Sequence, residues 1–410
     1  MIVGAGQAGI SCAMALRRGG WEGPVTLVGR EPHFPYERPP LSKRVLIAEV
    51  GPESLILADD DALAKLEVEF VQAEVVAIDR EHRRVRLSDG SERDYGHLVL
   101  ATGGNPRYLP AALPGADTPG VHVIRTIDDA VAVAHRLETV RDVVVIGGGF
   151  IGVEAAAALA SAGRNVAVLE AVPSLLARVA PVELGEWATS YLERHGVTVR
   201  TSTMAASIDT DDDGRLSGVT ATDGARYPAG LVIVGIGAVP EVALAESAGL
   251  RVERAIVVDD DLRTDDPAIF AVGDCAVQVR ADGTQHRLES VQAAQDQGRH
   301  VAGVLLGTSV AGYREVPWFW SDVGEARIQM AGRIDLATDV ILRGDVADDD
   351  FSLFGFDGDT FVGVATVNRS RDYLAGRMFL RSGRELQRST AADEAVDLRA
   401  LARRPVDPAR

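Results

Sequence analysis

Residues 1–18 read MIVGAGQAGISCAMALRR, a short apolar run followed by a glycine-rich loop and a stretch of helical character. Gly4, Gly6 and Gly9 have the spacing G-x-G-x-x-G, and the helix is expected over residues 7–18. In a dinucleotide site, the first glycine makes the tight turn, the second lets the backbone approach a pyrophosphate, and the third lets helix and strand pack closely. The start of the helix then offers N–H groups to the anion. Taken alone, the loop also fits a tight turn in a parallel sheet that binds no nucleotide.

The same pattern begins again at residue 143, where the chain reads VVVIGGGFIG. Gly147, Gly149 and Gly152 repeat the spacing, a helix is expected over residues 155–162, and a strand over residues 166–169 ends in Glu170. A carboxylate at this offset hydrogen-bonds a ribose 2′-hydroxyl and repels a 2′-phosphate, which predicts a preference for NADH over NADPH. Two such units in one chain predict two bound dinucleotides.

Acidic residues are also expected at the ends of strands in the first unit. The predicted strand over residues 25–28 is followed by Arg30 and Glu31. Glu31 is predicted to bind the ribose hydroxyls, whereas Arg30 is either a solvated charge or a cation over the adenine. A later strand stops at Gly273 and Asp274, where ligands bind in open α/β sheets; the alternative role of Asp274 is a helix N-cap.

Between these elements, residues 32–43 read PHFPYERPPLSK and contain four prolines. Proline fixes φ and removes a hydrogen-bond donor, so this stretch is expected to be neither a regular helix nor an inner strand. It is predicted to be a stiff arm that positions Arg38 and Lys43.

Composition narrows the function classes. A chain of 410 residues is longer than a single hydrophobic core usually accommodates, so two or three domains are expected. Its formal charge of -18 disfavours nucleic acid or an anionic membrane as a partner. No apolar run reaches membrane-spanning length, and the N-terminus has no basic leader, so we expect no signal peptide and a cytoplasmic protein. Cys12 and Cys275 are far apart and form no C-x-x-C motif, so no redox disulfide is expected. No metal site is expected.

Seven motifs, in this order and spacing, resemble one family. They are GAGQAG, PYERPPLSK, LVLATGG, GGGFIGVE, FAVGDC, RLESVQAAQDQ and PWFWSD. The chain from residue 1 to about residue 370 resembles the FAD- and NAD-dependent ferredoxin reductases of oxygenase systems, the putidaredoxin reductase type. Apoptosis-inducing factor and the rubredoxin and nitrite reductase flavoproteins share this scaffold.

The resemblance implies an α/β fold with two Rossmann-like dinucleotide-binding domains, similar to glutathione reductase, and a C-terminal α+β domain. We expect a discontinuous FAD-binding domain over residues 1–112 and 241–316, an NAD-binding domain over 113–240, and the C-terminal domain over 317–410. In the last of these, residues 351–356 and 360–367 predict a β-hairpin, followed by a helix from Asp372. Trp318 and Trp320, two residues apart, are expected on one face of a strand.

The resemblance also implies the site residues. Those implied to contact FAD are Gly4, Gly6, Ala8, Gly9, Glu31, Arg38, Lys43, Val75, Arg125, Asp274, Val291 and Trp320. Those implied to contact NADH are Gly147, Gly149, Ile151, Gly152, Glu154, Glu170, Gly235 and Glu289. Lys43, Glu154 and Trp320 are the implied catalytic residues. The chain departs from the family at Arg30, where relatives usually carry an acid, so the ribose contact falls on Glu31 alone.

The implied activity is hydride transfer from NADH to FAD, followed by single-electron transfer to a [2Fe-2S] or similar ferredoxin that feeds an oxygenase such as a haem monooxygenase. Lys43 and Glu154 are expected to pair, and Phe150 either covers the nicotinamide site or packs in the core. Arg327, Arg333, Arg369, Arg371 and Arg377 are candidate docking cations for an acidic ferredoxin, or else a solvated charged face. We expect a monomer or weak dimer. The alternatives are a rubredoxin-type reductase and an NADH-binding flavoprotein that acts mainly by interaction.

Overall fold

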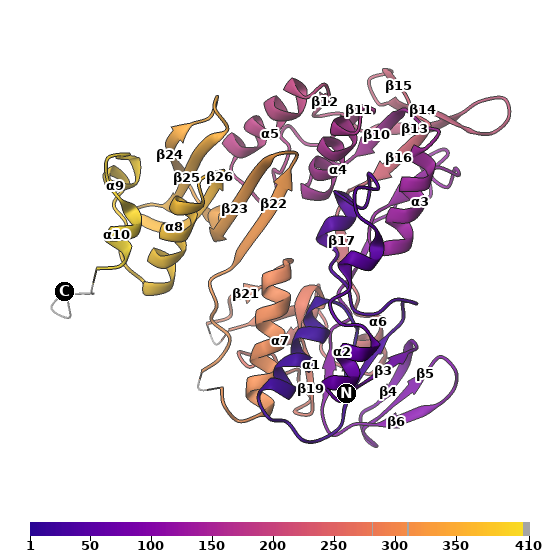
Figure 1. The fold of residues 1–410 in the computed structure, drawn as a ribbon, viewed down its shortest axis with the longest axis vertical. Coiled ribbons are helices and arrows are strands. Elements are labelled where there is room, and N and C mark those ends of the chain that lie inside the picture. The colour runs from indigo at the N-terminus through magenta and orange to yellow at the C-terminus, as the bar shows by residue number, and fades with distance from the viewer. Residues whose placement is uncertain (281, 310, 405–410) are drawn as a thin grey trace. The chain divides into compact units, whose positions relative to one another are not determined.

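The computed structural model describes residues 1–280, 282–309 and 311–404, and it divides the chain into two compact units. The first unit contains Met1–Glu37, Pro52–Asn105 and Ala238–Glu315. The second contains Arg38–Gly51, Pro106–Gly237 and Val316–Arg410, so the segments expected to form the NAD-binding and C-terminal domains pack together. The second half of the proline-rich arm also belongs to the second unit. The elements of both units are labelled in Figure 1.

A five-stranded parallel sheet forms the centre of the first unit, in the order β19-β7-β1-β2-β3. Its strands are β1 (Ile2–Val3), β2 (Val25–Gly29), β3 (Val68–Gln72), β7 (Leu98–Leu100) and β19 (Ile269–Ala271). The strands β1, β7 and β19 consist of apolar residues only, so they can be buried on both faces of the sheet, as the structure shows.

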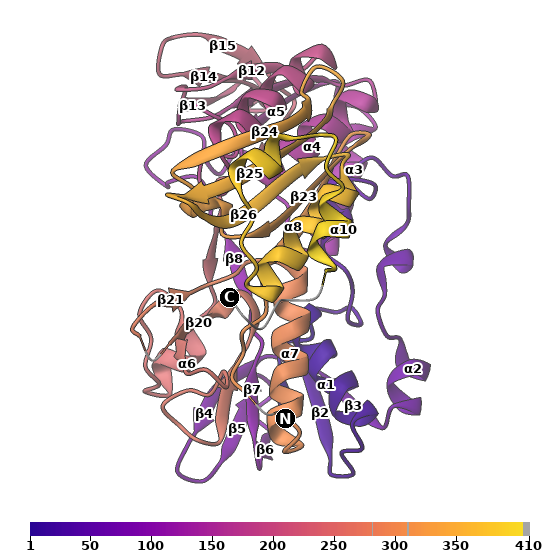
Figure 2. The same cartoon turned by 90° about the vertical axis from the view of Figure 1, so that its left-hand side faces the viewer.

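Two helices lie side by side on this unit, α1 (Gln7–Arg18) and α7 (Val291–Leu305), as both views of the ribbon show (Figures 1 and 2). The expected helix over residues 7–18 is confirmed. Gly298 allows the close approach, because a Cβ there would lie 2.5 Å from the carbonyl oxygen of Ala8.

The remaining elements of the first unit are small. They are the antiparallel sheet of β4 (Val75–Asp79), β5 (Arg84–Leu87) and β6 (Glu92–Asp94), the sheet of β18 (Ile256–Val258), β20 (Ala276–Val279) and β21 (Gln285–His286), the pair β8 (Gly104–Pro106) and β17 (Ala238–Pro240), the helices α2 (Asp60–Lys65) and α6 (Ala243–Ser247), and the 3-10 turns η2 (Pro52–Leu55) and η3 (Gly273–Cys275).

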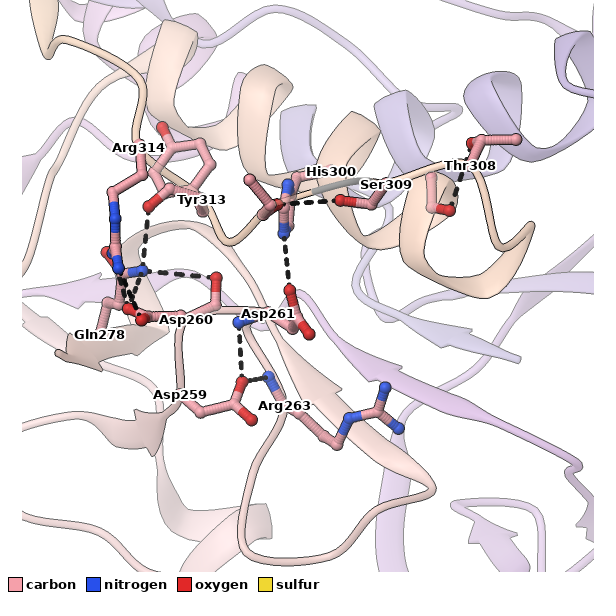
Figure 3. Close-up of polar contacts among 12 residues, drawn as sticks. Asp259, Asp260, Asp261, Arg263, Gln278, His300, Thr308, Ser309, Tyr313 and Arg314 are labelled. Carbon is pink, nitrogen blue, oxygen red and sulfur yellow. Dashed lines mark hydrogen bonds and ion pairs between the residues drawn. The ribbon is translucent and has the colours of Figure 1, made fainter. Parts of the chain in front are cut away.

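A turn at residues 259–263 ties the end of the first unit to its interior (Figure 3). Arg314 donates to both carboxylate oxygens of Asp260 at 2.7 Å, and the Asp260 carbonyl accepts from the Tyr313 N–H at 2.6 Å. On the facing helix α7, His300 Nε2 lies 3.6 Å from Asp261 Oδ1. Burial lowers the pKa of His300, against the opposing effect of Asp261, which favours the neutral imidazole.

The second unit repeats the parallel sheet. Its order is β12-β11-β10-β16-β9, with all pairs parallel. The strands are β9 (Val121–Val123), β10 (Asp142–Ile146), β11 (Asn165–Leu169), β12 (Thr198–Arg200) and β16 (Leu231–Val234). The strand before each glycine loop is central in its sheet, with the next two strands on one side, which confirms the repeat that the sequence predicts.

Three helices and a small sheet accompany this parallel sheet: α3 (Ile127–Leu137), α4 (Phe150–Ser161), α5 (Val182–Arg194), and the antiparallel β13 (Ala205–Thr210), β14 (Leu216–Ala221) and β15 (Arg226–Pro228). The helix expected over residues 155–162 starts earlier, at Phe150, because the glycine loop itself provides its N-cap at Gly149. Pro39–Ser42 forms one 3-10 turn, η1, with proline at its first positions, so the arm is not extended throughout.

The C-terminal part of the second unit is an antiparallel sheet in the order β22-β23-β26-β25-β24 with helices, as expected. Its elements are β22 (Trp318–Val323), β23 (Ala326–Gly332), η4 (Ile334–Leu336), β24 (Asp339–Asp345), β25 (Asp350–Asp357), β26 (Thr360–Val367), α8 (Ser370–Ser382), α9 (Arg388–Ala392) and α10 (Leu398–Ala402). The hairpin of β25 and β26 is confirmed. Buried Trp187 of α5 donates from Nε1 to Asp349 at 2.7 Å, which ties this part to the parallel sheet's helices. Among the described residues, no helix has the length and hydropathy needed to cross a membrane.

Candidate dinucleotide sites

The first glycine loop is shaped by two steric constraints and one opening. Gly4 has φ +108°, and a Cβ at this residue would lie 2.1 Å from the carbonyl oxygen of Ala101. A Cβ at Gly9 would lie 1.9 Å from the carbonyl oxygen of Gly4. Gly6 differs, because its Cβ position has no protein atom within 4 Å. The outer glycines are therefore required by packing, and the middle one leaves space in front of the backbone.

The second loop has the same geometry, position by position. Gly147 has φ +109°, and a Cβ at Gly152 would lie 2.0 Å from the carbonyl oxygen of Gly147. At Gly149, the nearest atom to a Cβ is the carbonyl oxygen of Gly235, at 4.0 Å. The two loops are thus two copies of one device.

Both open glycines are helix N-caps. Gly6 caps α1 and Gly149 caps α4, and neither has a side chain that accepts from the first N–H groups. The first turn of a helix has N–H groups without intrahelical partners and carries a partial positive charge. A helix start that has no capping side chain and faces open space fits a pyrophosphate, so the residues present fit two dinucleotides.

Glu170 lies at the end of β11 and is fixed against the second loop. Its Oε2 accepts from the Gly148 N–H at 2.5 Å, and its Oε1 accepts from the Val172 N–H at 2.9 Å. Each carboxylate oxygen has a second lone pair, so the group can still accept from a ribose hydroxyl. Glu170 therefore remains the predicted ribose contact of the second loop.

The corresponding acid of the first loop is Glu31, after β2. The hydroxyl of buried Tyr36 donates to its carboxylate. Its neighbour Arg30 points to other partners, because Nη2 donates to Asn105 Oδ1 at 2.9 Å and Nη1 lies 3.7 Å from Glu241 Oε2. Arg30 is therefore an ion-paired residue with a half-exposed side chain, and its partners belong to the paired strands β8 and β17 and the residue after them.

The predicted pair of Lys43 and Glu154 is present. Lys43 Nζ lies 2.8 Å from Glu154 Oε1, and both side chains are largely buried. Two serines complete the cluster: Ser42 Oγ donates to Glu154 Oε2 at 2.6 Å, and Ser321 Oγ donates to Glu154 Oε1 at 2.5 Å. The sequence analysis missed both serines, although each lies in a motif that it quoted, PPLSK and PWFWSD.

Aromatic side chains at the start of α4 and along β22 make ring contacts within the second unit. The ring of Phe150 lies 4.5 Å from that of Phe319, centroid to centroid, which is a packing contact in the second unit. Trp318 and Trp320 have centroids 6.1 Å apart, as expected for one face of β22. Arg377 lies over Trp318 with its Cζ 4.6 Å from the ring centroid.

The other predicted residues of the first unit fall into two groups. Ala8 and Asp274 lie close to the first loop, since a Cβ at Gly273 would lie 3.3 Å from the Cβ of Ala8. Asp274 is within η3, whose N-cap is Val272, and α7 is capped by Ser290, so the alternative of a helix N-cap is wrong for Asp274. Val75 is buried at the start of β4. Glu289 forms an ion pair with Arg287, and Val291 is the first residue of α7.

The other predicted residues of the second unit lie in its loops or in the first turn of α4. Arg38, before η1, donates to the carbonyl oxygen of Arg125, so these two residues are brought together. Gly235 follows β16 and packs on the second loop, since its Cβ would lie 3.4 Å from the Gly152 nitrogen. Ile151, in the first turn of α4, is 43% exposed.

Both cysteines are buried and free. Burial raises the pKa of Cys12 to about 12 and also raises the pKa of Cys275. The thiolate is the reactive form of cysteine, so neither residue is suited to redox chemistry. In the structure, the two cysteines form no disulfide with each other.

The candidate docking arginines are mostly engaged within the C-terminal part. Arg327 pairs with Asp322 at 2.9 Å, Arg333 with Asp335 at 2.7 Å, and Arg369 with Asp372 at 3.0 Å. Arg371 is exposed. Charges that are already paired contribute less field to a partner than isolated ones.

Comparisons with known proteins agree with this architecture. Residues 1–298 match the family model described as pyridine nucleotide-disulphide oxidoreductase, and residues 318–402 match the one described as reductase C-terminal. The chain is 44% identical to rhodocoxin reductase of Rhodococcus erythropolis, over 98% of this chain and 94% of that protein.

Two solved structures are similar over almost the whole chain. One is a ferredoxin reductase from Rhodopseudomonas palustris, with a TM-score of 0.94, 38% identity and 98% of each chain covered. The other is putidaredoxin reductase in a covalent complex with putidaredoxin, with a TM-score of 0.93, 37% identity, and 98% and 97% of the two chains covered.

Proposed function

This chain belongs to the pyridine nucleotide-disulphide oxidoreductase family, and we propose that it is the NADH-dependent, FAD-containing reductase of an iron–sulfur ferredoxin that supplies an oxygenase. Two relatives support the proposal, rhodocoxin reductase and the putidaredoxin reductase of the covalent complex with putidaredoxin, and each match covers 98% of this chain. The protein is an oxidoreductase that uses FAD and NAD(P)H.

The observation that carries the proposal is the pair of matching glycine loops, in each of which the middle glycine faces open space and the helix start has no capping side chain. We assign FAD to the loop at Gly4, because Glu31 and the turn of Asp274 belong to the same unit. NADH is assigned to the loop at Gly147, because Glu170 is fixed beside it. Arg38, Lys43, Val75, Arg125, Val291 and Trp320 remain predicted FAD contacts.

When bound, FAD supplies the redox chemistry, accepting two electrons as hydride and releasing them singly. The chain contributes orientation and electrostatics. Glu154 lies in the second turn of α4, one turn beyond the open end of the NADH loop, which suits a contact to the nicotinamide. Lys43, paired with it, supplies a positive charge beside that position.

The preference for NADH follows from Glu170. A second negative charge, on the 2′-phosphate of NADPH, would lie next to a carboxylate that two backbone N–H groups hold in place. Coulomb repulsion and the loss of the hydroxyl donor both disfavour NADPH.

The partner assignment rests on the relatives and on charge. With a net charge of -18, the chain requires a local basic surface to dock an acidic ferredoxin. Arg371, which is exposed, and Arg377, which lies over Trp318, are the candidates for this surface. We propose a cytoplasmic protein that is a monomer or weak dimer.

The test is an anaerobic titration of the purified yellow protein with NADH, followed by cytochrome c reduction with and without a [2Fe-2S] ferredoxin. Reduction of the flavin by NADH, and cytochrome c turnover only with the ferredoxin, are expected. Turnover with a rubredoxin and none with ferredoxins would instead identify a rubredoxin reductase. Flavin reduction without turnover on any carrier would favour a protein that acts by interaction.

A further inference from the structure

Glu154 is the centre of a buried polar cluster that draws on three distant segments of the second unit. Lys43 and Ser42 come from the end of the proline-rich arm, Glu154 from α4, and Ser321 from β22 in the C-terminal sheet. The two serines are separated from Glu154 by 112 and 167 residues in sequence. Glu154 is 6% exposed, Ser42 5% and Ser321 0%.

The hydrogen bonds of this cluster engage both carboxylate oxygens. Oε1 accepts from Lys43 Nζ at 2.8 Å and Ser321 Oγ at 2.5 Å, and Oε2 accepts from Ser42 Oγ at 2.6 Å. Ser42 Oγ is also 3.5 Å from the carbonyl oxygen of Pro39, but a hydroxyl has one proton, and the shorter contact takes it. The carboxylate is therefore fixed from three directions.

We propose that Ser42 and Ser321 are positioning residues for the hydride-transfer step. They act through Glu154: by holding its two oxygens, they fix the carboxylate, and with it the Lys43 ammonium, in the orientation in which the pair faces the nicotinamide. Ser321 gives the C-terminal sheet a part in the reaction with NADH, in addition to any part in docking a protein partner. This inference rests on the proposed function, in which Glu154 and Lys43 contact the nicotinamide.

Loss of one serine hydroxyl leaves a buried carboxylate oxygen short of one donor. A hydrogen bond to a charged group is worth about 1.5–3 kcal/mol, and a catalytic group that drifts from its productive orientation loses rate. For Ser321→Ala and Ser42→Ala, we expect hydride transfer to FAD to slow about tenfold, which is the lower end of that range. The affinity of these variants for NAD⁺ should fall as well, because the Glu154 and Lys43 side chains would no longer be held in one orientation.

The chain offers a matched control in Ser352. It is 0% exposed, lies on β25 of the same C-terminal sheet, and donates from Oγ to the Asp372 carboxylate at 2.9 Å. Ser352→Ala therefore removes a buried serine–carboxylate hydrogen bond without touching Glu154. It should lower the thermal unfolding temperature to a similar degree and leave hydride transfer unchanged.

The experiment measures four properties of the holoenzyme variants: the rate of hydride transfer by stopped flow, NAD⁺ affinity by calorimetry, bound FAD, and thermal unfolding. Ser321→Ala and Ser42→Ala are each combined with Glu154→Gln in a double-mutant cycle. If the serines act through Glu154, the tenfold loss is largely absent on the Glu154→Gln background. Ser42→Ala serves alone if Ser321→Ala does not fold.

Three results would overturn the inference: rates within twofold of wild type, losses equal to that of Ser352→Ala, or the same loss with and without the Glu154 carboxylate. A wild-type protein that NADH does not reduce would refute the proposed function instead, whatever the serine variants show.

Discussion

Gly9 packs so closely on Gly4 that a Cβ at Gly9 would lie 1.9 Å from the Gly4 carbonyl oxygen, and Gly152 packs on Gly147 in the same way, at 2.0 Å. In both loops this contact brings the helix start to the end of the strand. The middle glycine is left with open space before it, so the outer and middle glycines should respond differently to substitution.

Gly6→Ala is expected to fold with near-normal stability and to lose FAD, because its Cβ meets no protein atom within 4 Å but would project where the pyrophosphate lies. Gly149→Ala should retain bound FAD, but its flavin should no longer be reduced by NADH. Flavin absorbance and thermal unfolding measure both. Gly9→Ala is the contrasting variant: overpacking costs about 1–3 kcal/mol, so its unfolding temperature should fall. A yellow Gly6→Ala protein would contradict the assignment of this loop to FAD.

Glu170 should set the choice of nicotinamide cofactor. Glu170→Gln removes the charge while keeping one amide oxygen as acceptor, so the NADH to NADPH ratio of kcat/KM should fall about tenfold or more. Steady-state kinetics with both cofactors measure this ratio. Asp209, a partly buried carboxylate elsewhere in the same unit, gives the control Asp209→Asn. Equal rates of flavin reduction by NADPH and NADH in the wild type would refute the role of Glu170.

Adjacent residues Arg30 and Glu31 should separate in function. Glu31→Gln and Tyr36→Phe are expected to weaken FAD binding, because the Tyr36 hydroxyl orients the Glu31 carboxylate. Arg30→Ala should leave FAD affinity unchanged and cost at most about 1 kcal/mol of stability, since its ion pair with Glu241 is half-exposed. Titration of the FAD-free protein with FAD tests all three. Weaker FAD binding in Arg30→Ala would place the guanidinium over the adenine after all.

The two cysteines should be chemically silent in the native protein. Their thiols are buried, with the pKa of Cys12 raised to about 12 and that of Cys275 also raised. Iodoacetamide is expected to modify neither residue until the protein unfolds, as mass spectrometry can show. Cys12→Ser combined with Cys275→Ser should still turn over with ferredoxin. If alkylation of the folded protein abolished electron transfer, a cysteine thiol would have to take part in the reaction.

Stability should rise with pH across the mildly acidic range, and His300 should contribute. Burial lowers its pKa below the ordinary 6.5, against the opposing effect of Asp261, so the unfolded chain binds the proton more readily. The contribution of His300 to the free energy of unfolding is therefore at its maximum above about pH 6.5. It declines as the pH falls toward the folded-state pKa.

The variant His300→Gln tests this contribution, with urea unfolding at several pH values between 5 and 7.5 as the measurement. Its pH slope should be smaller than that of wild type, while burial of His97 and His122, which lowers the pKa of both, preserves part of the slope. An unchanged slope would show that His300 titrates alike in both states.

The sequence by itself determined the two glycine loops, the helices that follow them and the strands that flank them. Those features depend on neighbours in the chain: a glycine at positive φ, a buried apolar run, or an acid at the end of a strand can be recognised locally. The absence of a cysteine pair was likewise readable from spacing. The pairing of Lys43 with Glu154 needed the family resemblance, because the two residues are 111 positions apart in the sequence and no local pattern joins them.

Only the tertiary structure decided what surrounds Glu154 and where Arg30 points. Ser42 and Ser321 are unremarkable in the sequence, since serine is common and fits a turn or a strand equally well. Their role depends on the packing of an arm, a helix and a distant sheet around one carboxylate, and burial then obliges each donor to meet an acceptor. Arg30 likewise has a partner only because Asn105 and Glu241 fold next to it. Long-range packing, which no periodicity in the sequence encodes, determines the surroundings of Glu154 and the partners of Arg30.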